Sequence, residues 1–236
     1  MSLRMSRAAI LAMLAVTIAA PTSAHAAPIL DQAFVPPSDM HFQAGIFGAP
    51  QPFGRIDLAQ TFTVGITGFL SQIDVFVLHS GASGPGPLLL DVRSTIGGVP
   101  SESDIAVLGH ASIQSDAMPI GPPPLFHAFV SFDLSPFAIP VVAGDVLAIV
   151  LRSDSTSVFS WGGIAGNPYG GGQNFNRRGP LGTWEQPPSI VAGDFGFKTY
   201  VTPVPEPSSL ALAGFGIVAL VARRRISSRF PAALPD

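Results

Sequence analysis

Short hydrophobic runs recur along the middle of the chain, and turn-forming residues separate them. The runs are rich in Val, Ile, Leu, Phe and Thr, whereas Gly, Pro, Ser and Asp lie between them. This pattern is typical of a β-sandwich made of short strands. We expect strands at Asp57–Val64, Phe69–Leu78, Leu88–Ser94, Val107–Ile113, His127–Leu134, Val146–Ser153, Val158–Trp161 and Phe195–Val201.

Two local patterns add detail to this prediction of strands. Ile73, Val75 and Val77 alternate with other residues in the second run, which predicts one buried face of a strand. Asp145 and Asp194 each follow Val-Ala-Gly and precede a hydrophobic run. Because Gly-Asp ahead of such a run is typical of a tight turn, we expect both aspartates to lie in turns.

A longer apolar run marks the N-terminus. It covers residues 8–20, begins after two arginines and is followed by Ala24 and Ala26. This order is that of a secretory signal peptide with an Ala-x-Ala cleavage site. The run is shorter than the roughly 20 apolar residues that a membrane-spanning helix needs. We therefore expect a signal peptide that is cut after Ala26, so that the mature chain begins at Ala27.

The C-terminus carries a second composite signal. A Pro-Glu-Pro motif precedes the apolar run Leu210–Ala222, and three arginines follow the run. The prolines keep a short stretch extended and accessible to a processing enzyme. The arginines favour the cytoplasmic face of the membrane. A helix of this run reaches about 20 Å, short of the roughly 30 Å hydrocarbon core. The expected sorting residues are Pro205, Glu206, Pro207, Arg223, Arg224 and Arg225.

Residues 204–225 resemble the PEP-CTERM sorting signal of Gram-negative bacteria. The resemblance implies export by the secretion machinery and processing near the Pro-Glu-Pro motif by exosortase, a membrane protease-transpeptidase. It also implies a precursor that is transiently anchored in the inner membrane, with its body outside the cytoplasm, before it reaches the cell envelope or the medium. Such a tail is also labelled an ice-binding protein C-terminal domain, a label that describes the tail alone. Residues 226–236 extend further than is usual in the family.

These signals divide the chain into a signal peptide at 1–26, an extracellular β-sandwich domain at 27–203, a PEP-CTERM signal at 204–225 and a cytoplasmic tail at 226–236. The expected fold class is all-β, an antiparallel sandwich flanked by an N-terminal signal helix and a short C-terminal transmembrane helix at 210–222. The body is also similar to choice-of-anchor jelly-roll domains, which implies a sandwich of jelly-roll type. The similarity rests on Ala59–Val64, Ile73–Phe76, Gly97–Ser101, Ala143–Val150 and Asp194–Tyr200.

Composition and charge narrow the classes of function. The chain holds 25 Gly and 24 Pro, which suits many turns and few helices. Between Ala27 and Val204, six basic residues stand against thirteen acidic ones. An acidic body without a basic stripe argues against nucleic-acid binding. The absence of cysteine from the sequence excludes a disulfide framework, a thiolate zinc site and a cysteine nucleophile.

The sequence shows no catalytic constellation. His41, His79, His110 and His127 stand singly, without the spacing that places two imidazoles on one metal ion. A glycosidase needs two carboxyl groups at a defined separation in space, so a secreted glycan-active hydrolase stays open as an alternative. We expect no catalytic residue, metal site or cofactor. Calcium at a loop is the alternative, since carboxylates and loop carbonyls suit that ion.

The stretch from Trp161 to Trp184 is the best candidate for a binding site. It combines both tryptophans with amide side chains, arginines and many glycines. Flat aromatic rings pack on sugar rings, while amide and guanidinium groups bond to hydroxyls and carboxylates. The competing interpretation places the tryptophans in the core and the glycines in tight turns. The candidate glycan-binding residues are Trp161, Tyr169, Asn174, Arg177 and Trp184.

These observations favour a non-catalytic protein of the cell envelope or exopolysaccharide, sorted by exosortase and able to bind glycans. Binding requires only a suitable surface, whereas hydrolysis requires a positioned acid and base. The expected partners are exosortase, the secretion machinery and an exopolysaccharide, with membrane contact through the C-terminal helix and no nucleic acid. A purely structural or adhesive surface protein is a further alternative to the glycan-active hydrolase.

Overall fold

The computed structural model describes residues 26–37, 42–48, 54–79, 85–118, 127–187 and 193–204. Within these ranges the chain forms β-strands and three short 3-10 helices, and no α-helix. The expected signal helix and the expected transmembrane helix at 210–222 lie outside the described residues. None of the helices in the described ranges has the length and hydropathy to span a membrane.

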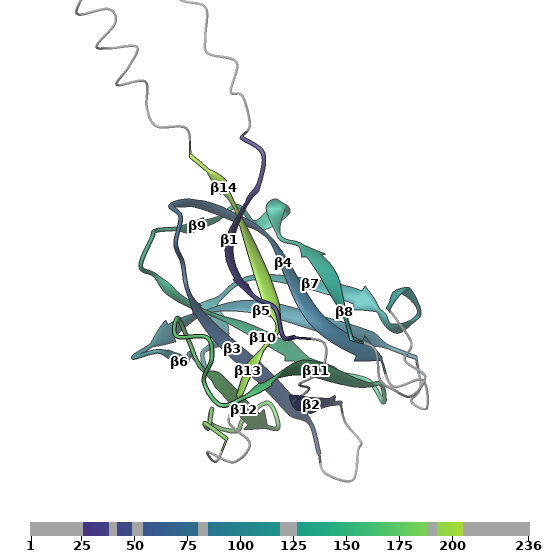
Figure 1. Ribbon diagram of the computed structural model, residues 1–236. Helices are drawn as coiled ribbons and strands as arrows, with labels where there is room; N and C mark the ends of the chain where they lie inside the picture. Colours follow the sequence, from purple (N-terminus) through teal and green to yellow (C-terminus); the bar gives the residue numbers. More distant parts are fainter. Residues whose placement is uncertain are drawn as a thin grey trace, which may run out of the picture.

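The strands form one compact body, in which most neighbouring strands are not consecutive in the sequence (Figure 1). Their bounds are β1 Ile29–Phe34, β2 Phe42–Phe47, β3 Ile56–Thr63, β4 Gly68–His79, β5 Pro87–Ile96, β6 Val99–Pro100, β7 Val107–Gln114, β8 Ala128–Asp133, β9 Ile139–Val141, β10 Val146–Arg152, β11 Val158–Ala165, β12 Asn174–Arg178, β13 Gly193–Phe195 and β14 Phe197–Pro203. The 3-10 helices are η1 Asp104–Ala106, η2 Ser115–Ala117 and η3 Ser135–Phe137.

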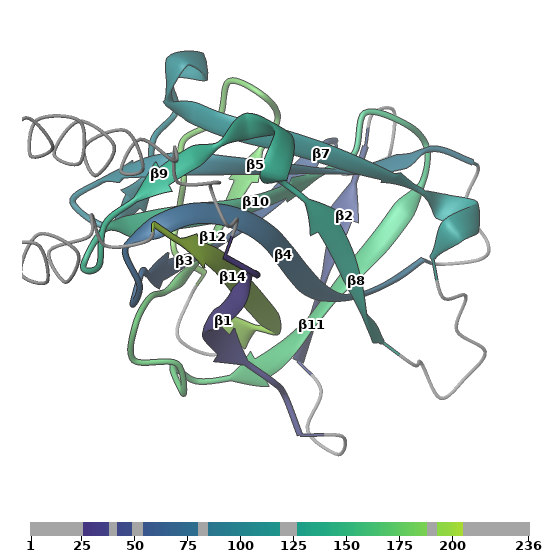
Figure 2. The same ribbon diagram turned by 90° about the horizontal axis from the view of Figure 1, so that it is seen from above.

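Strand pairing divides the body into two antiparallel sheets. The first sheet contains β12, β3, β10, β5, β6 and β7, and the second contains β1, β14, β4, β8, β9, β11, β2 and β13. The two are joined at one edge, where β2 pairs with β3 only through Phe47 and Ile56. Seen from above, β5, β7 and β10 form one layer, and β4, β8 and β14 lie in the other (Figure 2). The described fold is therefore all-β and sandwich-like.

The main core fills the space between the two layers. Alternate residues of a strand point to opposite faces, so each strand contributes every second side chain. Ile73, Val75 and Val77 of β4 are fully buried there, which confirms the buried face predicted from their alternation. Phe62 of β3 meets Phe197 of β14, with ring centroids 5.9 Å apart. The burial of these apolar side chains supplies the main favourable term in folding.

The opposite face of the first sheet carries different side chains. On β3 this face holds Asp57, Ala59, Thr61 and Thr63, because Leu58 and Phe62 point into the main core. A second, smaller cluster of buried apolar residues lies on this face. Its members are Ala59, Ala148, Val150, Phe175 and Trp184. We call this surface the outer face of the first sheet.

The first and last strands lie side by side. β1 pairs with β14 from Ile29 opposite Val201 to Phe34 opposite Phe197. Figure 1 shows both strands leaving the same end of the body. Thr199 strengthens the pair, since its Oγ1 accepts a hydrogen bond from the backbone N–H of Gln32 at 3.1 Å. The two ends of the domain are thus fixed to each other.

The strands expected from hydrophobic runs are present. Six agree with the structure within two residues at either end, and the strand expected at Val158–Trp161 continues to Ala165. The expected strand Phe195–Val201 is interrupted at Gly196, whose carbonyl accepts a hydrogen bond from the N–H of Phe76 in β4 and whose N–H donates to the carbonyl of Gly162 in β11. A Cβ atom at Gly196 would lie 2.7 Å from Pro36. The runs did not predict β1, β2, β6, β9 or β12.

The prediction of a turn is wrong for one of the two Gly-Asp segments. Asp145 does close the turn before β10, where its carboxylate accepts a hydrogen bond from the N–H of Val142 at 2.8 Å. Asp194 instead lies within β13 and is almost fully buried. Its strand pairs with β11, Asp194 being opposite Ile164. The two segments share the sequence Val-Ala-Gly-Asp, but they therefore do not share the same local structure.

Candidate functional site

A groove lies on the outer face of the first sheet, beside the smaller apolar cluster. Its volume is about 540 Å³. Its lining comes from β3, the turn at 97–99, the glycine-rich segment at 170–173 and the chain around Trp184. The lining residues are Thr61, Thr63, Gly97, Gly98, Val99, Val146, Asn167, Gly170, Gly171, Gly172, Gln173, Phe175, Trp184 and Gln186.

The glycine-rich segment is held tightly against β3. The backbone N–H of Thr61 donates to the carbonyl of Gln173 at 2.9 Å, and the N–H of Gln173 donates to Thr61 Oγ1 at 2.9 Å. Thr63 Oγ1 donates to the carbonyl of Gly171 at 2.8 Å. A Cβ atom at Gly172 would lie 1.8 Å from the carbonyl oxygen of Thr61, so this approach requires glycine. The groove wall is therefore rigidly placed.

Aromatic side chains form the apolar part of the groove. Phe175 comes from β12, and Trp184 comes from the chain that follows it. Backbone hydrogen bonds in both directions between Asn176 and Glu185, each 2.9 Å long, hold this returning chain against β12. The guanidinium carbon of Arg177 lies 4.6 Å from the centre of the Trp184 ring, in cation–π contact. The Trp184 side chain is thus held in place by the backbone pairing of its segment and by the cation–π contact.

Amide side chains form the polar part. Gln186 Nε2 donates a hydrogen bond to Gln173 Oε1 across the groove. Asn167, with its amide turned so that Nδ2 donates, bonds to Asp194 Oδ2 at 3.0 Å. Together with the threonine hydroxyls, these groups make the lining polar without any charged side chain. Such a surface can exchange hydrogen bonds with neutral hydroxyl-rich ligands.

Trp161 lies away from the groove. It is fully buried in the main core, and its ring is stacked on Phe195 with centroids 4.7 Å apart. Its indole Nε1–H donates to the carbonyl of Gly196 at 3.0 Å. A ring without exposed surface has no face to offer to a sugar. The core interpretation of this tryptophan fits the structure.

Trp184 is largely buried but borders the groove. Its indole Nε1 has no hydrogen-bond partner among the described residues. Phe175, beside it in the same cluster, also lines the groove. Trp184 is therefore the tryptophan of the predicted pair that reaches the candidate site.

Arg177 and Asn174 are also buried. Arg177 Nη2 forms an ion pair with Asp57 at 2.7 Å, which holds the guanidinium group against the sheet. Asn174 is directed to a smaller hollow of about 190 Å³ next to the groove. Its Nδ2 has no partner among the described residues. The structure thus brings Asn174, Arg177 and Trp184 into one region, although only Trp184 lines the groove.

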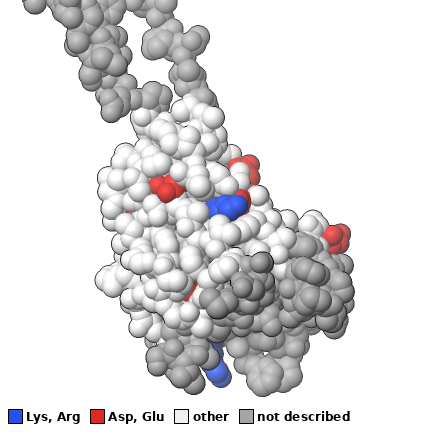
Figure 3. All heavy atoms as spheres, in the orientation of Figure 1, with Lys and Arg blue, Asp and Glu red and all other residues white. Residues whose placement is uncertain are grey.

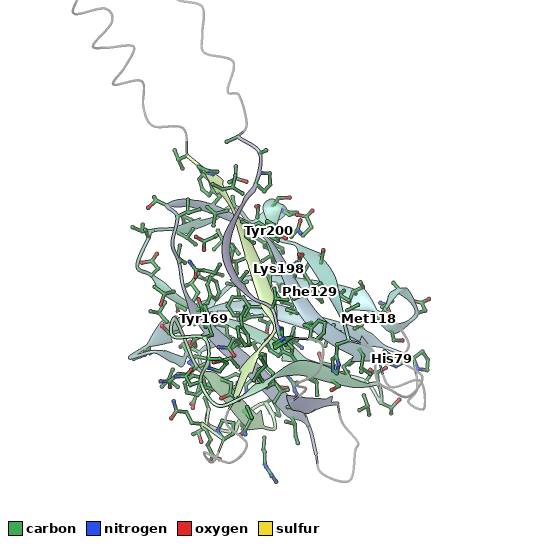
Figure 4. The ribbon with its side chains drawn as sticks, viewed as in Figure 1. His79, Met118, Phe129, Tyr169, Lys198 and Tyr200 are labelled. Atoms are coloured by element: carbon green, nitrogen blue, oxygen red, sulfur yellow. The ribbon has the colours of Figure 1, made fainter. Side chains whose placement is uncertain are left out.

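Tyr169 is half-buried and serves mainly as a packing residue. Its ring contacts Phe197 edge-on at 5.1 Å, and its hydroxyl donates to Gln32 Oε1 at 3.1 Å. Burial raises the pKa of Tyr169 to about 12. His79 does not line the groove, and Figure 4 shows it on the opposite side of the view from Tyr169.

Asp194 is a buried carboxylate behind the groove. It accepts hydrogen bonds from the N–H of Tyr169 at 2.8 Å and from Gln60 Nε2 at 3.1 Å. Burial raises its pKa, while these two hydrogen bonds act in the opposite direction. Its oxygens orient the loop that carries Asn167 and Tyr169. Within the described ranges, no three His, Cys, Asp or Glu side chains come close enough to hold a metal ion together.

Sequence reasoning found only part of the groove. Asn167 and Gln173 lie in the stretch from Trp161 to Trp184 that was predicted as a binding site, but Thr61, Thr63 and Gln186 lie outside it. The threonines face the groove because they alternate with core residues on β3, a signal visible once the register of that strand is known.

Comparison with known families identifies the C-terminal segment. The model of the PEP-CTERM protein-sorting motif matches residues 203–225. A search of curated proteins found no match. The chain therefore carries a PEP-CTERM sorting motif, which is the mark of an exported protein directed to the cell envelope by exosortase. The match begins at Pro203, the last residue of β14, so the folded domain directly adjoins the motif.

Proposed function

We propose that the protein is a non-catalytic component of the cell envelope or exopolysaccharide, and that its β-domain binds a neutral glycan in the groove. The observation that carries the proposal is the uncharged lining, which combines threonine and amide side chains with the aromatic rings of Phe175 and Trp184. Sugar rings present apolar C–H faces and many hydroxyls, and this groove offers partners for both.

The composition of the groove also supports a non-catalytic role. Glycoside hydrolysis requires a carboxylic acid and a carboxylate on the two sides of the scissile bond. The residues that line the groove include no Asp, Glu or His. A glycan bound there would therefore meet hydrogen-bonding groups but no general acid or base.

Sorting determines where in the cell envelope this binding domain acts. The precursor is exported, loses residues 1–26 and is held transiently by residues 210–222 until exosortase acts near Pro205–Pro207. The domain then remains in the envelope or is released, with its groove facing the extracellular polymer. The two antiparallel sheets agree with the proposed jelly-roll class, in which strands of both sheets enclose one core.

Glycan binding by the full chain, purified in mild detergent, tests the proposal. A glycan array would identify a neutral oligosaccharide, and calorimetry would give its affinity. Gln186→Ala removes an exposed amide of the groove and is expected to weaken binding about three- to tenfold, the value of a lost neutral hydrogen bond. Gln114→Ala, at an exposed site on β7, is the matched control and should bind as the parent does.

Three outcomes would contradict the proposal. Failure to bind any neutral glycan would leave a structural or adhesive role. Equal weakening by both glutamine variants would place the binding elsewhere. Release of new reducing ends from a bound glycan would show that the protein is an enzyme.

A further inference from the structure

A second hollow lies on the outer face of the first sheet and differs from the groove in its charge. Its volume is about 450 Å³. It is lined by Arg55, Asp91, Arg93, Asp104, Val107, His110, Arg152, Arg177 and Pro180. The described residues contain six lysines and arginines in all, and four of them line this hollow. We call it the arginine hollow.

The concentration of arginines is unusual for this molecule, whose body is acidic. Charged side chains are sparse on the face shown in Figure 3. Of the two remaining cations, Lys198 lies on β14 in the second sheet, where its Nζ is 4.2 Å from the centre of the Phe129 ring (Figure 4). Arg178 is exposed and does not line the hollow.

Strand register brings the arginines together. Arg177 of β12 lies opposite Asp57 of β3, and on β5 Asp91 and Arg93 lie two positions apart on the same face. Arg152 ends β10, between β3 and β5. Neighbouring strands are about 4.8 Å apart, which is within reach of an extended arginine side chain. The hollow is therefore built by the sheet rather than by a loop.

The charges form a continuous chain of ion pairs. Asp57 binds Arg177 at 2.7 Å and Arg55 at 2.7 Å, and Asp154 binds Arg55 at 2.8 Å and Arg152 at 2.6 Å. Asp91 continues the chain to Arg152 at 3.0 Å and to Arg93 at 3.5 Å. Four guanidinium groups thus share three carboxylates within the chain of ion pairs, and Asp104, which lines the hollow outside that chain, offsets its one excess positive charge.

Two guanidinium groups retain unused donors. Arg93 has only 6% of its side chain exposed, and its Nε has no partner among the described residues. Its Nη1 donates to the carbonyls of Ser101 and Ser103 at 3.2 and 3.3 Å, which holds the group in place. Arg152 is 23% exposed and uses Nε and Nη1 for its ion pairs. Arg93 Nε is itself buried, so the donor that a ligand in the hollow can reach is Nη2 of Arg152, which takes no part in that residue's ion pairs.

We propose that the arginine hollow binds a carboxylate monoanion, and, resting on the proposed association with exopolysaccharide, that this carboxylate belongs to a sugar acid, a uronate. The planar guanidinium fork matches a carboxylate. Because Asp91 and Asp104 also line the hollow and repel anions, a monoanion is better suited to it than a phosphate dianion. Asp104 is exposed at the rim and has no ion pair among the described residues. This site is separate from the groove and recognises a different chemical group.

Titration of the full chain with glucuronate tests the proposal, with glucose and acetate as the other ligands. Glucuronate is expected to raise the melting temperature and to bind more weakly at high salt, because the interaction is electrostatic. Glucose should have no effect at this hollow, and acetate a smaller one. An effect of acetate equal to that of glucuronate would overturn the assignment to a sugar acid, and no effect of glucuronate would overturn the proposal.

Three variants locate the binding. Arg152→Gln is expected to weaken glucuronate binding about 10- to 100-fold, the value of a charge-assisted hydrogen bond. Asp104→Asn removes a repelling charge at the exposed rim and should strengthen binding, even if Arg152→Gln disturbs the fold. Arg178→Gln, in the same strand as Arg177 but outside the hollow, is the control. Unchanged affinity in Asp104→Asn, or equal weakening in Arg178→Gln, would contradict the proposal. Neutral glycans report on the groove and glucuronate on this hollow, so each proposal fails independently of the other.

Discussion

Trp161 shows how much a single side chain contributes to this fold. It is fully buried, stacked on Phe195, and donates its indole N–H to the carbonyl of Gly196. We predict that Trp161→Ala lowers the free energy of unfolding by about 3 to 5 kcal/mol, because it leaves a large cavity in the core. Denaturant unfolding followed by far-UV circular dichroism measures this change.

The Trp161→Phe variant separates the two contributions of this residue. It keeps an aromatic ring but removes the N–H, so the carbonyl of Gly196 loses one partner. The expected cost is smaller, about 1 to 3 kcal/mol. A Trp161→Ala protein as stable as the parent would show that the ring lies outside the core.

The two tyrosines provide a pH-dependent test of the structure. Burial raises the pKa of Tyr169 to about 12. Burial, followed by the hydrogen bond from its hydroxyl to Asp74 and the charge of that carboxylate, raises the pKa of Tyr200. Since both shifts are upward, the stability that they represent is complete below pH 10, the ordinary tyrosine value, and is lost as the pH rises through the folded pKa.

Ultraviolet titration of tyrosinate absorbance measures both groups, because the chain contains only two tyrosines. The midpoint of Tyr169 is expected near pH 12. In Tyr200→Phe a single titration of Tyr169 should remain. A midpoint near pH 10 in that variant would mean that Tyr169 is exposed to solvent.

At the scale of elements, β1 contributes to the stability of the fold although its sequence did not predict a strand. It covers one side of β14, and Asp31 Oδ1 accepts a hydrogen bond from the N–H of Gly65 at 2.9 Å. Without β1, β14 would become an exposed edge strand. We predict that deletion of residues 29–34 lowers the melting temperature, by about 2 to 4 °C for each kcal/mol that the β1–β14 pair contributes in a domain of this size.

Differential scanning calorimetry of the deletion protein measures this shift, and Leu30→Ala serves as a control that keeps the strand. Leu30 is exposed, so its truncation should change the melting temperature little. An unchanged melting temperature in the deletion protein would show that the β1–β14 pair is not needed for stability.

The strength of local pattern explains which strands could be predicted. Strands such as β4 and β10 are buried and rich in Val, Ile and Leu, so their runs are evident in the sequence. β1 is mostly exposed or half-buried, and β12 reads Asn-Phe-Asn-Arg-Arg. These strands exist because an already formed neighbour offers backbone partners, which is tertiary information. The same limit explains Asp194, whose local turn signal is overridden by pairing with β11.

The candidate sites, like the strands, could be predicted only in part from the sequence. The glycine-rich, amide-rich stretch was recognisable as a binding candidate, but its two tryptophans have different roles because only the chain after β12 returns to the outer face. Arg55, Arg93 and Arg152 are far apart in the sequence and carry no motif. Their proximity follows from strand order and register, which hydrophobic runs alone do not specify.

At the scale of the whole molecule, the sorting motif determines where the domain acts. We predict that Glu206→Ala together with Pro207→Ala leaves unprocessed precursor in the membrane fraction, because exosortase no longer recognises its site. Immunoblotting of membrane, envelope and medium fractions of the native host follows the precursor. A host without exosortase should reproduce this pattern, and identical fractionation of variant and parent would refute it.

The position of β14 has a mechanical consequence for the tethered protein. This strand pairs with β4 from Phe197 to Pro203 and with β1 on its other side, and the sorting segment continues directly from its end. If the protein stays attached through the segment that follows β14, as proposed, a pull on the body by flow or by a stretched polymer loads β14 at its C-terminal end. The hydrogen bonds of both ladders lie across the axis of this strand, so they resist in shear and together, rather than opening one after another. The domain would thus withstand drag at the attachment point better than one tethered through a strand that can be peeled from an edge.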